Sequence, residues 1–282
     1  MTIDLSVIIV NWNTRDLLHI CLKSLYHYTH GMTVEVFVVD NGSNDGSADM
    51  VAQQFPQVIL LRNQDNVGFS RANNQALRQA SGRYLLLLNS DTALKTNTLQ
   101  KLVAFMDAHP TAGIAGPKLL NPDDSRQYSC DMFPRTPLTM LRDKLLENFF
   151  PTKHPRWSAR MEHLNFQEHF LVDYVIGAVF IIRRTTVEQI GLLDEQFFMY
   201  AEDIDWCYRA ALAGWKIYYV GQVAVYHYNR GSSEKSPEQS SRLQAMRAKS
   251  LRLFYRKHYG RVNAFLLLVI MTLKSKTNHK NL

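Results

Sequence analysis

Three carboxylates stand within four positions of the sequence, in the stretch FMYAEDIDWCYR at residues 198–209. Glu202, Asp203 and Asp205 follow a run of mostly apolar residues, QFFMYA. Carboxylates in the first turn of a helix interact favourably with the positive end of its dipole, so the helix alone could account for them. A carboxylate that is partly desolvated in an apolar pocket instead has a raised pKa and is a better general base. The residues by themselves support both interpretations.

The residues around these acids predict a helix over 202–213. Its apolar positions repeat at helical spacing and would form a buried stripe: Ile204, Cys207, Tyr208 and Ala211. Gly214 suits the position just past the helix end, and Asp205 can pair with Arg209 four residues on. Asp203 and Trp206 are three positions apart and share a face, which makes Trp206 a candidate aromatic wall for a pocket around Asp203.

Four polar clusters in the first 92 residues each follow a short apolar segment. The apolar segments show continuous rather than alternating hydrophobicity, which is typical of strands covered on both faces of a parallel sheet: residues 5–10, 34–40, 58–62 and 84–89. The polar clusters are NWN at 11–13, DNGSNDGS at 40–47, NQDNVGFS at 63–70 and NSDT at 89–92. Any one of them can be an ordinary turn, but four at equivalent strand ends indicate a common site.

Helix-like stretches separate these strands, at residues 14–28, 46–55, 69–80 and 96–108. Strands and helices that alternate in this way predict an open, doubly wound α/β sheet. In such sheets ligands bind beyond the carboxyl ends of the strands, where the polar clusters lie.

The rest of the chain is less regular. Residues 122–170 contain five scattered prolines, and we interpret them as an inserted region with one helix near 137–149. Beyond it we expect further elements in this order: a strand at 174–184, a short helix from Thr185, the helix at 202–213, a strand at 216–229, a basic helix at 241–259 and a short apolar segment at 264–273. That last segment has ten residues, too few to cross a bilayer as a helix.

The bulk composition narrows the class of protein. The chain has 282 residues, 46% hydrophobic and 20% charged, which suits one large or two small globular domains. Its three cysteines, Cys21, Cys130 and Cys207, are far apart and lack CxxC spacing. This argues against a disulfide framework or a zinc site and fits a reducing cytosol. We expect no secretory signal, because residues 1–10 already read as a strand.

The net charge of +7 is unevenly distributed. Residues 241–282 carry ten Lys or Arg and no acid, so the preceding residues carry 22 basic and 25 acidic groups, a net −3. A basic tail of this kind indicates an anionic partner, either nucleic acid or a membrane surface. No recognised nucleic-acid-binding motif accompanies it.

Together these motifs resemble the family 2 glycosyltransferases, which are inverting enzymes with a GT-A fold. The likeness is strongest to the bacterial rhamnosyltransferase-like branch that builds surface polysaccharide. It rests on SVIIVNWN, NVGFSRANNQAL, LLNSDT, GLLDEQFFMYAEDIDWCYRAALAGWKIYYV and YHYNRGSS. The chain departs from the family in residues 122–170 and in the tail.

The resemblance implies a GT-A (Rossmann-like) α/β fold with a mostly parallel sheet flanked by helices. The expected parts are a glycosyltransferase domain at 1–240 and a basic amphipathic C-terminal helical extension at 241–282. Within the domain, residues 1–121 would bind the nucleotide sugar, 122–170 would be a variable insertion, and 171–240 would form the acceptor and catalytic half.

For the nucleotide sugar, the resemblance implies the binding residues Asn11, Asn13, Asp40, Asn66, Gly68, Asn73, Asn89 and Asp91. Asp40, in VDNGSNDGS, would bind the base or ribose, with Asn11 and Asn13 lining the same end. The residues of NVGFSRANN would shape the nucleotide and diphosphate pocket.

The resemblance also implies a divalent cation, Mg²⁺ or Mn²⁺. The tripeptide NSD occupies the position of the family's DXD motif. Asn89 replaces the usual first acid, so Asp91 would be the principal carboxylate ligand. His227, in YHY, matches a histidine that completes metal and diphosphate binding; a structural histidine is the alternative. Hard cations prefer oxygen ligands, which suits Asp91, and a histidine is compatible with Mn²⁺.

Asp203, the second acid of AED, matches the family's catalytic base. Inverting transfer requires an acceptor oxygen that loses its proton as it attacks, and one carboxylate on the acceptor side can accept that proton. It also requires charge stabilisation on the departing nucleoside diphosphate, which a cation shared with the phosphates supplies. Gly177, Glu202, Asp205 and Trp206 would orient the acceptor or support the site.

The implied function is a metal-dependent glycosyltransferase of cell-surface polysaccharide synthesis. We expect dTDP-rhamnose as donor, a saccharide or lipid-linked saccharide as acceptor, and a cytoplasmic protein held at the inner face of the membrane by peripheral contact with anionic lipid. A UDP-hexose-dependent enzyme of the same fold, or a non-catalytic sugar- or membrane-binding relative, is the alternative. A dinucleotide oxidoreductase is excluded because the first turn, NWNTRD, lacks the required glycines. A nucleotidyltransferase is excluded by the missing glycine- and lysine-rich loop.

Overall fold

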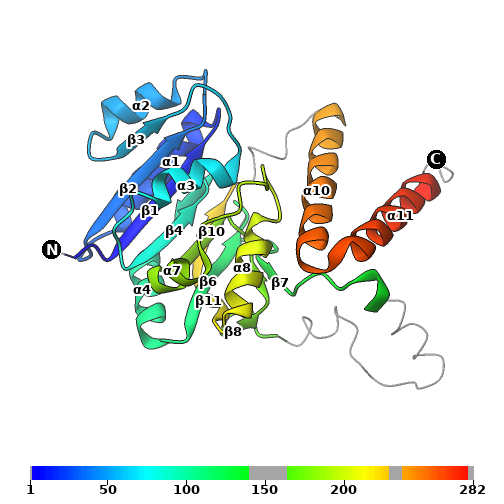
Figure 1. Cartoon of the computed structure of the whole chain (residues 1–282). Coiled ribbons are helices and arrows are strands. Elements are labelled where there is room, and N and C mark those ends of the chain that lie inside the picture. Colours follow the sequence, from blue (N-terminus) through cyan, green and yellow to red (C-terminus); the bar gives the residue numbers. More distant parts are fainter. Residues whose placement is uncertain (1, 140–163, 229–236, 279–282) are drawn as a thin grey trace.

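The computed structural model describes residues 2–139, 164–228 and 237–278 (Figure 1). The first 120 residues alternate strands and helices as the sequence predicts. In chain order the elements are β1 (Leu5–Asn11), α1 (Arg15–Tyr28), β2 (Val34–Asp40), α2 (Ser47–Gln54), β3 (Ile59–Arg62), α3 (Phe69–Leu77), β4 (Tyr84–Leu88), β5 (Thr92–Leu94), α4 (Thr98–Ala108) and β6 (Ala112–Leu120). The short β5 and the long β6 are additions that the sequence patterns did not indicate.

The remaining elements are β7 (Cys130–Asp131), β8 (His169–Val172), β9 (Tyr174–Val175), β10 (Val179–Arg183), α7 (Arg184–Ile190), α8 (Glu202–Leu212), β11 (Lys216–His227), α10 (Pro237–His258) and α11 (Gly260–Asn278). The prediction of a single strand at 174–184 is therefore wrong, because residues 176–178 separate β9 from β10. Most of the helix predicted near 137–149 lies outside the described residues. The apolar segment at 264–273 is part of α11 rather than a separate short element.

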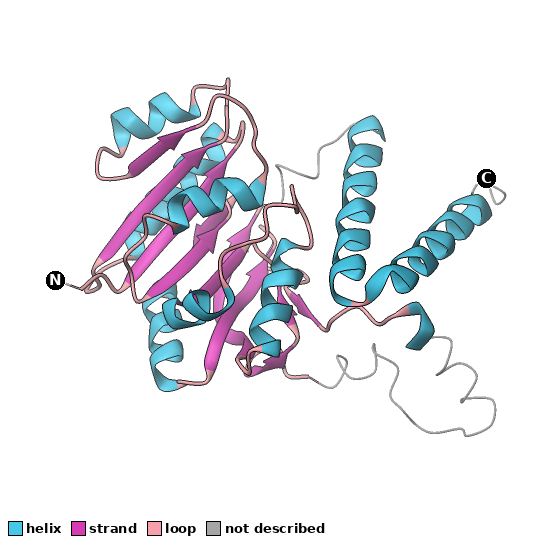
Figure 2. Ribbon diagram, viewed as in Figure 1, coloured by secondary structure: helices cyan, strands magenta, loops and turns pink. Residues whose placement is uncertain are grey.

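One central sheet organises the molecule (Figure 2). Its strand order is β3-β2-β1-β4-β10-β6-β11-β5, and β8 also pairs with β11. The pairings place β1, β2, β3, β4, β6 and β11 in one direction and β5, β8 and β10 in the other. The sheet is mostly parallel, which confirms the predicted fold class.

Helices cover both faces of this sheet. Successive residues of β1 alternate in direction, so Val7 and Ile9 join the core beneath α1, α2 and α4. Ile8 points to the opposite core, which α3 and α8 cover. Strands with both faces buried explain why the sequence shows continuous apolar runs instead of alternation.

The register of the parallel strands sets the position of the polar clusters. Asn11 at the end of β1 pairs with Asp40 at the end of β2, and Asp40 pairs in turn with Arg62 of β3. The carboxyl ends of these strands therefore meet at one edge of the sheet, and the loops that follow them are brought together.

Helix α10 packs beside α8, and α11 follows α10 and extends away from the sheet (Figure 1). A separate apolar cluster joins them to the segment before α8, with Phe197, Phe254 and Tyr255 buried at its centre. None of the helices in the described part of the chain is long and apolar enough to cross a membrane.

Candidate active site

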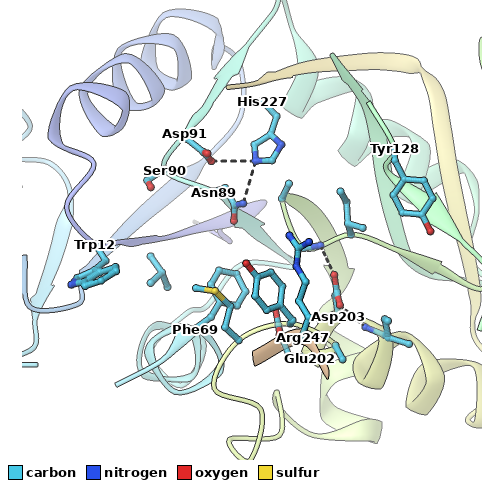
Figure 3. A pocket seen from close by; sticks show the side chains of 18 of the residues that line it. Trp12, Phe69, Asn89, Ser90, Asp91, Tyr128, Glu202, Asp203, His227 and Arg247 are labelled. Atoms are coloured by element: carbon cyan, nitrogen blue, oxygen red, sulfur yellow. Dashed lines mark hydrogen bonds and ion pairs between the residues drawn. The ribbon is translucent and has the colours of Figure 1, made fainter. Parts of the chain in front are cut away.

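A cavity of about 790 Å³ lies where the polar strand ends meet α8, β11 and α10 (Figure 3). Seven of the residues singled out from the sequence line it: Asn66, Asn89, Asp91, Gly177, Glu202, Asp203 and His227. The structure thus brings together motifs that are up to 161 positions apart in the chain, between Asn66 and His227. Asn13 lies instead in an adjoining hollow, which shares Trp12 and Thr14 with the main cavity.

Buried hydrogen bonds hold the first strand ends together. Asn11 donates through Nδ2 to Asp40 Oδ2 and to Ser43 Oγ, each at 3.1 Å. The other Asp40 oxygen accepts the Ser43 N–H at 3.0 Å, and only 3% of Asp40 is exposed. Asn11 and Asp40 do not line the cavity, so what the structure shows for them is support of the loop at its edge.

Asn41 organises the next loop through its side-chain amide. Its Oδ1 accepts from Asn63 Nδ2 at 3.0 Å and from the Val67 N–H at 3.1 Å, and its Nδ2 donates to Asn66 Oδ1 at 2.9 Å. Asn66 Oδ1 also accepts the N–H of Gly68 at 3.0 Å. These bonds present Asn66 to the cavity.

Gly68 makes a close backbone approach that no other residue permits. Its φ is +89°, and a Cβ there would lie 2.7 Å from the carbonyl oxygen of Phe198. The next residue, Phe69, donates its N–H to that same carbonyl at 2.6 Å. The absence of a side chain at Gly68 therefore lets the start of α3 pack directly against the segment that leads to the three acids.

Asn73 does not reach the cavity. It is buried in α3, where Nδ2 donates to the Phe69 carbonyl at 2.9 Å and Oδ1 has no protein partner among the described residues. The expected diphosphate contact of Asn73 is thus without direct support from its position.

Asp91 and His227 face each other across the ends of β4 and β11. Asp91 Oδ1 lies 3.2 Å from His227 Nε2, and Asn89 Nδ2 lies 3.5 Å from the same ring nitrogen. His227 Nδ1 is 2.9 Å from Oε1 of Gln127. The Gln127 amide is oriented by its Nε2, which donates to the His227 carbonyl at 2.6 Å. The amide oxygen can accept only a proton carried by Nδ1, so in the neutral ring Nε2 has the lone pair, and this nitrogen faces Asp91.

This donor set fits a divalent cation. A neutral Nε2 and a carboxylate oxygen both present lone pairs, and a cation between them would satisfy both. Within the described ranges no group of three or more His, Cys, Asp or Glu residues could hold a metal. Asp91 and His227 could therefore hold a cation only if further ligands came from phosphate oxygens and water, as Mg²⁺ commonly accepts.

Strained backbone delivers the acids to the cavity. Tyr200 and Ala201 have φ values of +69° and +63°, a conformation that costs about 1–3 kcal/mol at a residue other than glycine. A contact from α10 supports this turn, since Ser250 donates its hydroxyl to the Met199 carbonyl at 2.7 Å. Two consecutive left-handed residues turn the chain so that α8 begins at Glu202.

Asp203 is held by two backbone N–H groups. Its Oδ2 accepts from Gly177 at 2.9 Å and its Oδ1 accepts from Ile204 at 2.8 Å. Burial raises the pKa of Asp203 above its usual range, although the two backbone hydrogen bonds favour the charged form. Gly177 lies between β9 and β10, where its N–H bonds Asp203 instead of a neighbouring strand.

Glu202 is a buried acid without a full set of partners. It is 6% exposed, and its Oε2 accepts no hydrogen bond from the described residues. Burial and then the nearby charge of Asp203 raise the pKa of Glu202 well above its usual range. This environment stabilises the protonated form relative to water, and a protonated Glu202 would donate a hydrogen bond in the cavity.

Asp205 is structural rather than part of the cavity. It is fully buried and accepts from His258 Nε2 and Lys257 Nζ at 2.7 Å each and from Arg209 Nε at 2.9 Å. Burial opposes its ionisation, but these three basic groups outweigh burial and hold the pKa of Asp205 at about 2. The prediction of the Asp205–Arg209 pair is confirmed, and the residue ties α8 to α10.

The prediction that Trp206 walls the pocket is wrong. Trp206 is fully buried in the core, stacks on Phe180 with ring centroids 5.4 Å apart, and donates Nε1–H to the Gly191 carbonyl at 2.9 Å. The aromatic residues that do line the cavity are Trp12, Phe69, Tyr128, Tyr174 and Tyr200.

Sequence reasoning missed several lining residues. Trp12 is 53% exposed at a strand end, and an aromatic between the two asparagines of NWN is a signal that could have identified it. Tyr128 lies in the proline-rich region, where its hydroxyl donates to Asp131 and lies 3.0 Å from the Tyr174 hydroxyl. Arg247 lies on α10 among other basic residues, and no pattern in the sequence distinguishes it from them.

Comparison with known proteins identifies a matching family model and relatives of this chain. The family model described as glycosyl transferase family 2 matches residues 6–191. An N-acetylglucosaminyl-diphospho-decaprenol L-rhamnosyltransferase of Mycobacterium tuberculosis is 29% identical over 251 residues, which are 84% of this chain and 80% of that protein. Rhamnosyltransferase WbbL of Escherichia coli (strain K12) is 28% identical over 174 residues, or 57% of this chain and 61% of that protein.

Solved structures share the fold. Mannosyltransferase PcManGT from Pyrobaculum calidifontis, in complex with GDP-Man and Mn²⁺, superposes with a TM-score of 0.62 at 19% identity, over 93% of this chain and 65% of that one. GalNAc-T7 with UDP, GalNAc and Mn²⁺ gives 0.60 at 19% identity, over 80% of this chain and 44% of that one. The chain thus spans less than two thirds of either protein, and the likeness confirms the expected GT-A architecture.

Proposed function

The chain belongs to glycosyltransferase family 2 and is a glycosyltransferase, and from this premise we propose that it is a metal-dependent, inverting rhamnosyltransferase of surface-polysaccharide synthesis. The observation that carries the proposal is the layout of the one cavity in Figure 3, with Asp203 on one side and the Asp91–His227 pair on the other. A base and a cation site that face each other are what a single displacement between acceptor and donor requires.

Asp203 serves as the general base in this proposal. The Gly177 and Ile204 N–H groups fix its carboxylate, so the oxygen that takes the proton has a defined position. Its raised pKa increases its basicity toward the acceptor hydroxyl, which must lose its proton as it attacks the anomeric carbon. Glu202, whose pKa is raised beside it, would orient the acceptor through a hydrogen bond.

Asp91 and His227 would hold Mg²⁺ or Mn²⁺. When bound, the cation supplies positive charge to the departing nucleoside diphosphate. Gln127 keeps His227 in the tautomer that a metal needs, and Asn89 stands beside both ligands. The nucleotide would lie toward the ends of β1, β2 and β3, with Asn66 in contact and Asn11, Asn13, Asp40, Gly68 and Asn73 shaping the loops.

The donor and acceptor follow from the relatives. Two of the relatives described above are named rhamnosyltransferases, and one of these is named for an acceptor in which a saccharide is joined through diphosphate to a lipid. We therefore assign dTDP-rhamnose as donor and a diphosphate-lipid-linked saccharide as acceptor. Residues 1–240 would form the catalytic domain and residues 241–282 the basic extension.

Such an acceptor requires the protein to reach a membrane surface from the cytoplasm. Residues of α11 form an exposed apolar face at helical spacing: Val262 (64% exposed), Phe265 (62%) and Val269 (38%). The exposed Arg252, Arg256 and Arg261 stand on the same two helices. A helix with an apolar face and nearby cations suits peripheral attachment to anionic lipid.

The proposed donor can be tested by thermal shift with dTDP-rhamnose, UDP-glucose and GDP-mannose, each with and without Mn²⁺. Binding to the native state raises Tm, so dTDP-rhamnose with Mn²⁺ should give the largest increase. Transfer of rhamnose to N-acetylglucosaminyl-diphospho-farnesol should then be detectable by mass spectrometry. A larger shift with UDP-glucose would assign a UDP-hexose donor instead, and binding without turnover on any acceptor would point to a non-catalytic relative.

A further inference from the structure

We propose that Arg247 is the residue that recognises an anionic acceptor, binding the diphosphate that joins the acceptor saccharide to its lipid. The inference deepens the proposed function by assigning the acceptor charge to one side chain. It starts from the charges of the cavity, where Arg247 is the single Lys or Arg among the described lining residues.

The guanidinium of Arg247 is available for a ligand. Three carboxylates line the same cavity, yet none of them forms an ion pair with Arg247 among the described residues. Its recorded contact is with the ring of Tyr200, whose centroid lies 4.6 Å from the guanidinium carbon. Stacking on an aromatic face orients the planar guanidinium and leaves its N–H donors free. The guanidinium can then donate two parallel hydrogen bonds to a phosphate group.

The helix that carries Arg247 is fixed to the body of the protein. Ser250, Phe254 and His258 share a face of α10 with Arg247, at intervals of three, seven and eleven residues. Ser250 bonds the Met199 carbonyl, Phe254 is fully buried, and His258 bonds the buried Asp205. The same face that anchors α10 thus presents Arg247 to the cavity.

The position of Arg247 favours the acceptor over the donor. In Figure 3 its side chain enters from the side of Glu202 and Asp203, and Asp91 and His227 lie across from it. The proposed cation at Asp91 and His227 would neutralise the donor diphosphate. A neutral saccharide beside Asp203 needs no guanidinium, whereas a saccharide joined to diphosphate carries charge that Arg247 would meet.

The test compares two acceptors that differ in charge, with dTDP-rhamnose and Mn²⁺ present throughout. One is N-acetylglucosaminyl-diphospho-farnesol and the other is the neutral farnesyl N-acetylglucosaminide. Arg247→Ala should raise KM for the diphosphate acceptor by ~10- to 100-fold, the loss typical of a charge-assisted hydrogen bond. KM for the neutral acceptor and the affinity for dTDP should not change. Arg247→Lys should fall between the two, because it retains charge but loses the planar guanidinium.

Lys249→Ala is the matched control, since Lys249 is exposed on the same helix and does not line the cavity. Equal increases of KM for both acceptors would overturn the proposal. A loss of dTDP affinity in Arg247→Ala would also overturn it and would assign Arg247 to the donor phosphates.

A binding measurement separates this inference from the proposed activity. Farnesyl diphosphate should bind the wild-type chain in calorimetry more tightly than farnesol, and Arg247→Ala should remove the difference. If rhamnose transfer fails while this difference holds, the assigned donor is wrong and the anion site stands. If the wild type binds both farnesyl compounds equally, the anion site is wrong whatever the donor.

Discussion

The two sides of the cavity are built with different chemistry. On the side of β1 to β3, amides, hydroxyls and the Asp40 carboxylate bond one another: Asn41 alone bonds Asn63, Asn66 and Val67. On the side of α8, Glu202 keeps an oxygen without a described partner, and the backbone of Tyr200 is strained. The satisfied side can present a fixed shape to a nucleotide, whereas the unsatisfied side keeps ionisable groups free to exchange protons.

The largest expected effect is the loss of transfer rate in Asp203→Asn, on the α8 side of the cavity. Removal of a general base typically costs ~10²–10⁴-fold in rate, so transfer should be lost at saturating donor while dTDP affinity stays near that of the wild type. Because burial raises the pKa of Asp203, the acidic limb of the wild-type pH–rate profile should lie above the usual aspartate range, with activity falling as the pH drops through that pKa. A variant that keeps more than about a tenth of wild-type turnover would assign the base elsewhere.

The cation site should show a smaller effect, confined to the donor. Asp91→Ala and His227→Ala should each weaken Mn²⁺-dependent dTDP binding by at least the ~10- to 100-fold typical for loss of a group that orients a metal ligand. Gln127→Ala removes only the acceptor for His227 Nδ1–H and should fall within that range. Calorimetry with and without EDTA measures both. Equal dTDP binding under the two conditions would contradict a metal role.

Asp205 lies outside the cavity, so we expect its charge to contribute to stability and not to the proposed reaction. Asp205→Asn should lower the free energy of unfolding by about 3 kcal/mol, since it removes the partner of three basic groups. The folded pKa of about 2 lies below the value of 3.8 that is usual for an aspartate in water. The ionised form therefore stabilises the protein above pH ~3.8, and about 2 kcal/mol is lost as the pH falls toward 2.

Urea unfolding at several pH values measures this contribution. Asp49→Asn is the control, because the Asp49–Arg62 pair is exposed and should change stability little. An unfolding free energy for Asp205→Asn equal to that of the wild type at pH 7 would show that the three basic groups find other partners.

The smallest expected effect lies outside the cavity, at the apolar face of α11. The protein should co-sediment with anionic liposomes at low salt and largely detach near ~0.5 M NaCl, because each basic group near the surface contributes only ~1 kcal/mol and salt screens it. Deletion of 261–282 should reduce this binding and preserve dTDP affinity, and Phe265→Ser should reduce it less.

Ile59→Ser is a control, since Ile59 is 40% exposed on β3, which is distant from α11 in the sequence. Equal binding to neutral and anionic liposomes would contradict the electrostatic part of the attachment. Loss of the fold on truncation would instead show that α11 closes the core.

The sequence predicted the parallel strands and the meeting of their ends because both depend on local patterns. It predicted the period of α8 but only part of its buried face. Of the stripe expected at Ile204, Cys207, Tyr208 and Ala211, Cys207 is buried and the other three are partly buried, while Trp206 and Ala210 are buried as well. Which face is buried depends on β10 and α10, which pack from elsewhere in the chain.

Residues whose roles depend on partners far away in the sequence could not be predicted from the sequence either. Arg247 is one of ten basic residues in the tail, and its place at the cavity follows from the Ser250 and His258 contacts of α10. Gly177 interrupts an apolar run by a single position, too little to predict that the strand breaks there to bond Asp203.

The contact between α10 and Asp205 also has a consequence for chimeric enzymes. The basic C-terminal extension lies beyond residues 6–191, which the family model matches, so it is a natural candidate for exchange between homologues. However, a tail grafted from another protein would place an unneutralised carboxylate in the interior unless it brought basic groups equivalent to Lys257 and His258. A recombination junction just before α10 would separate residues that must be inherited together, so a productive swap would have to take α8 and α10 as one block.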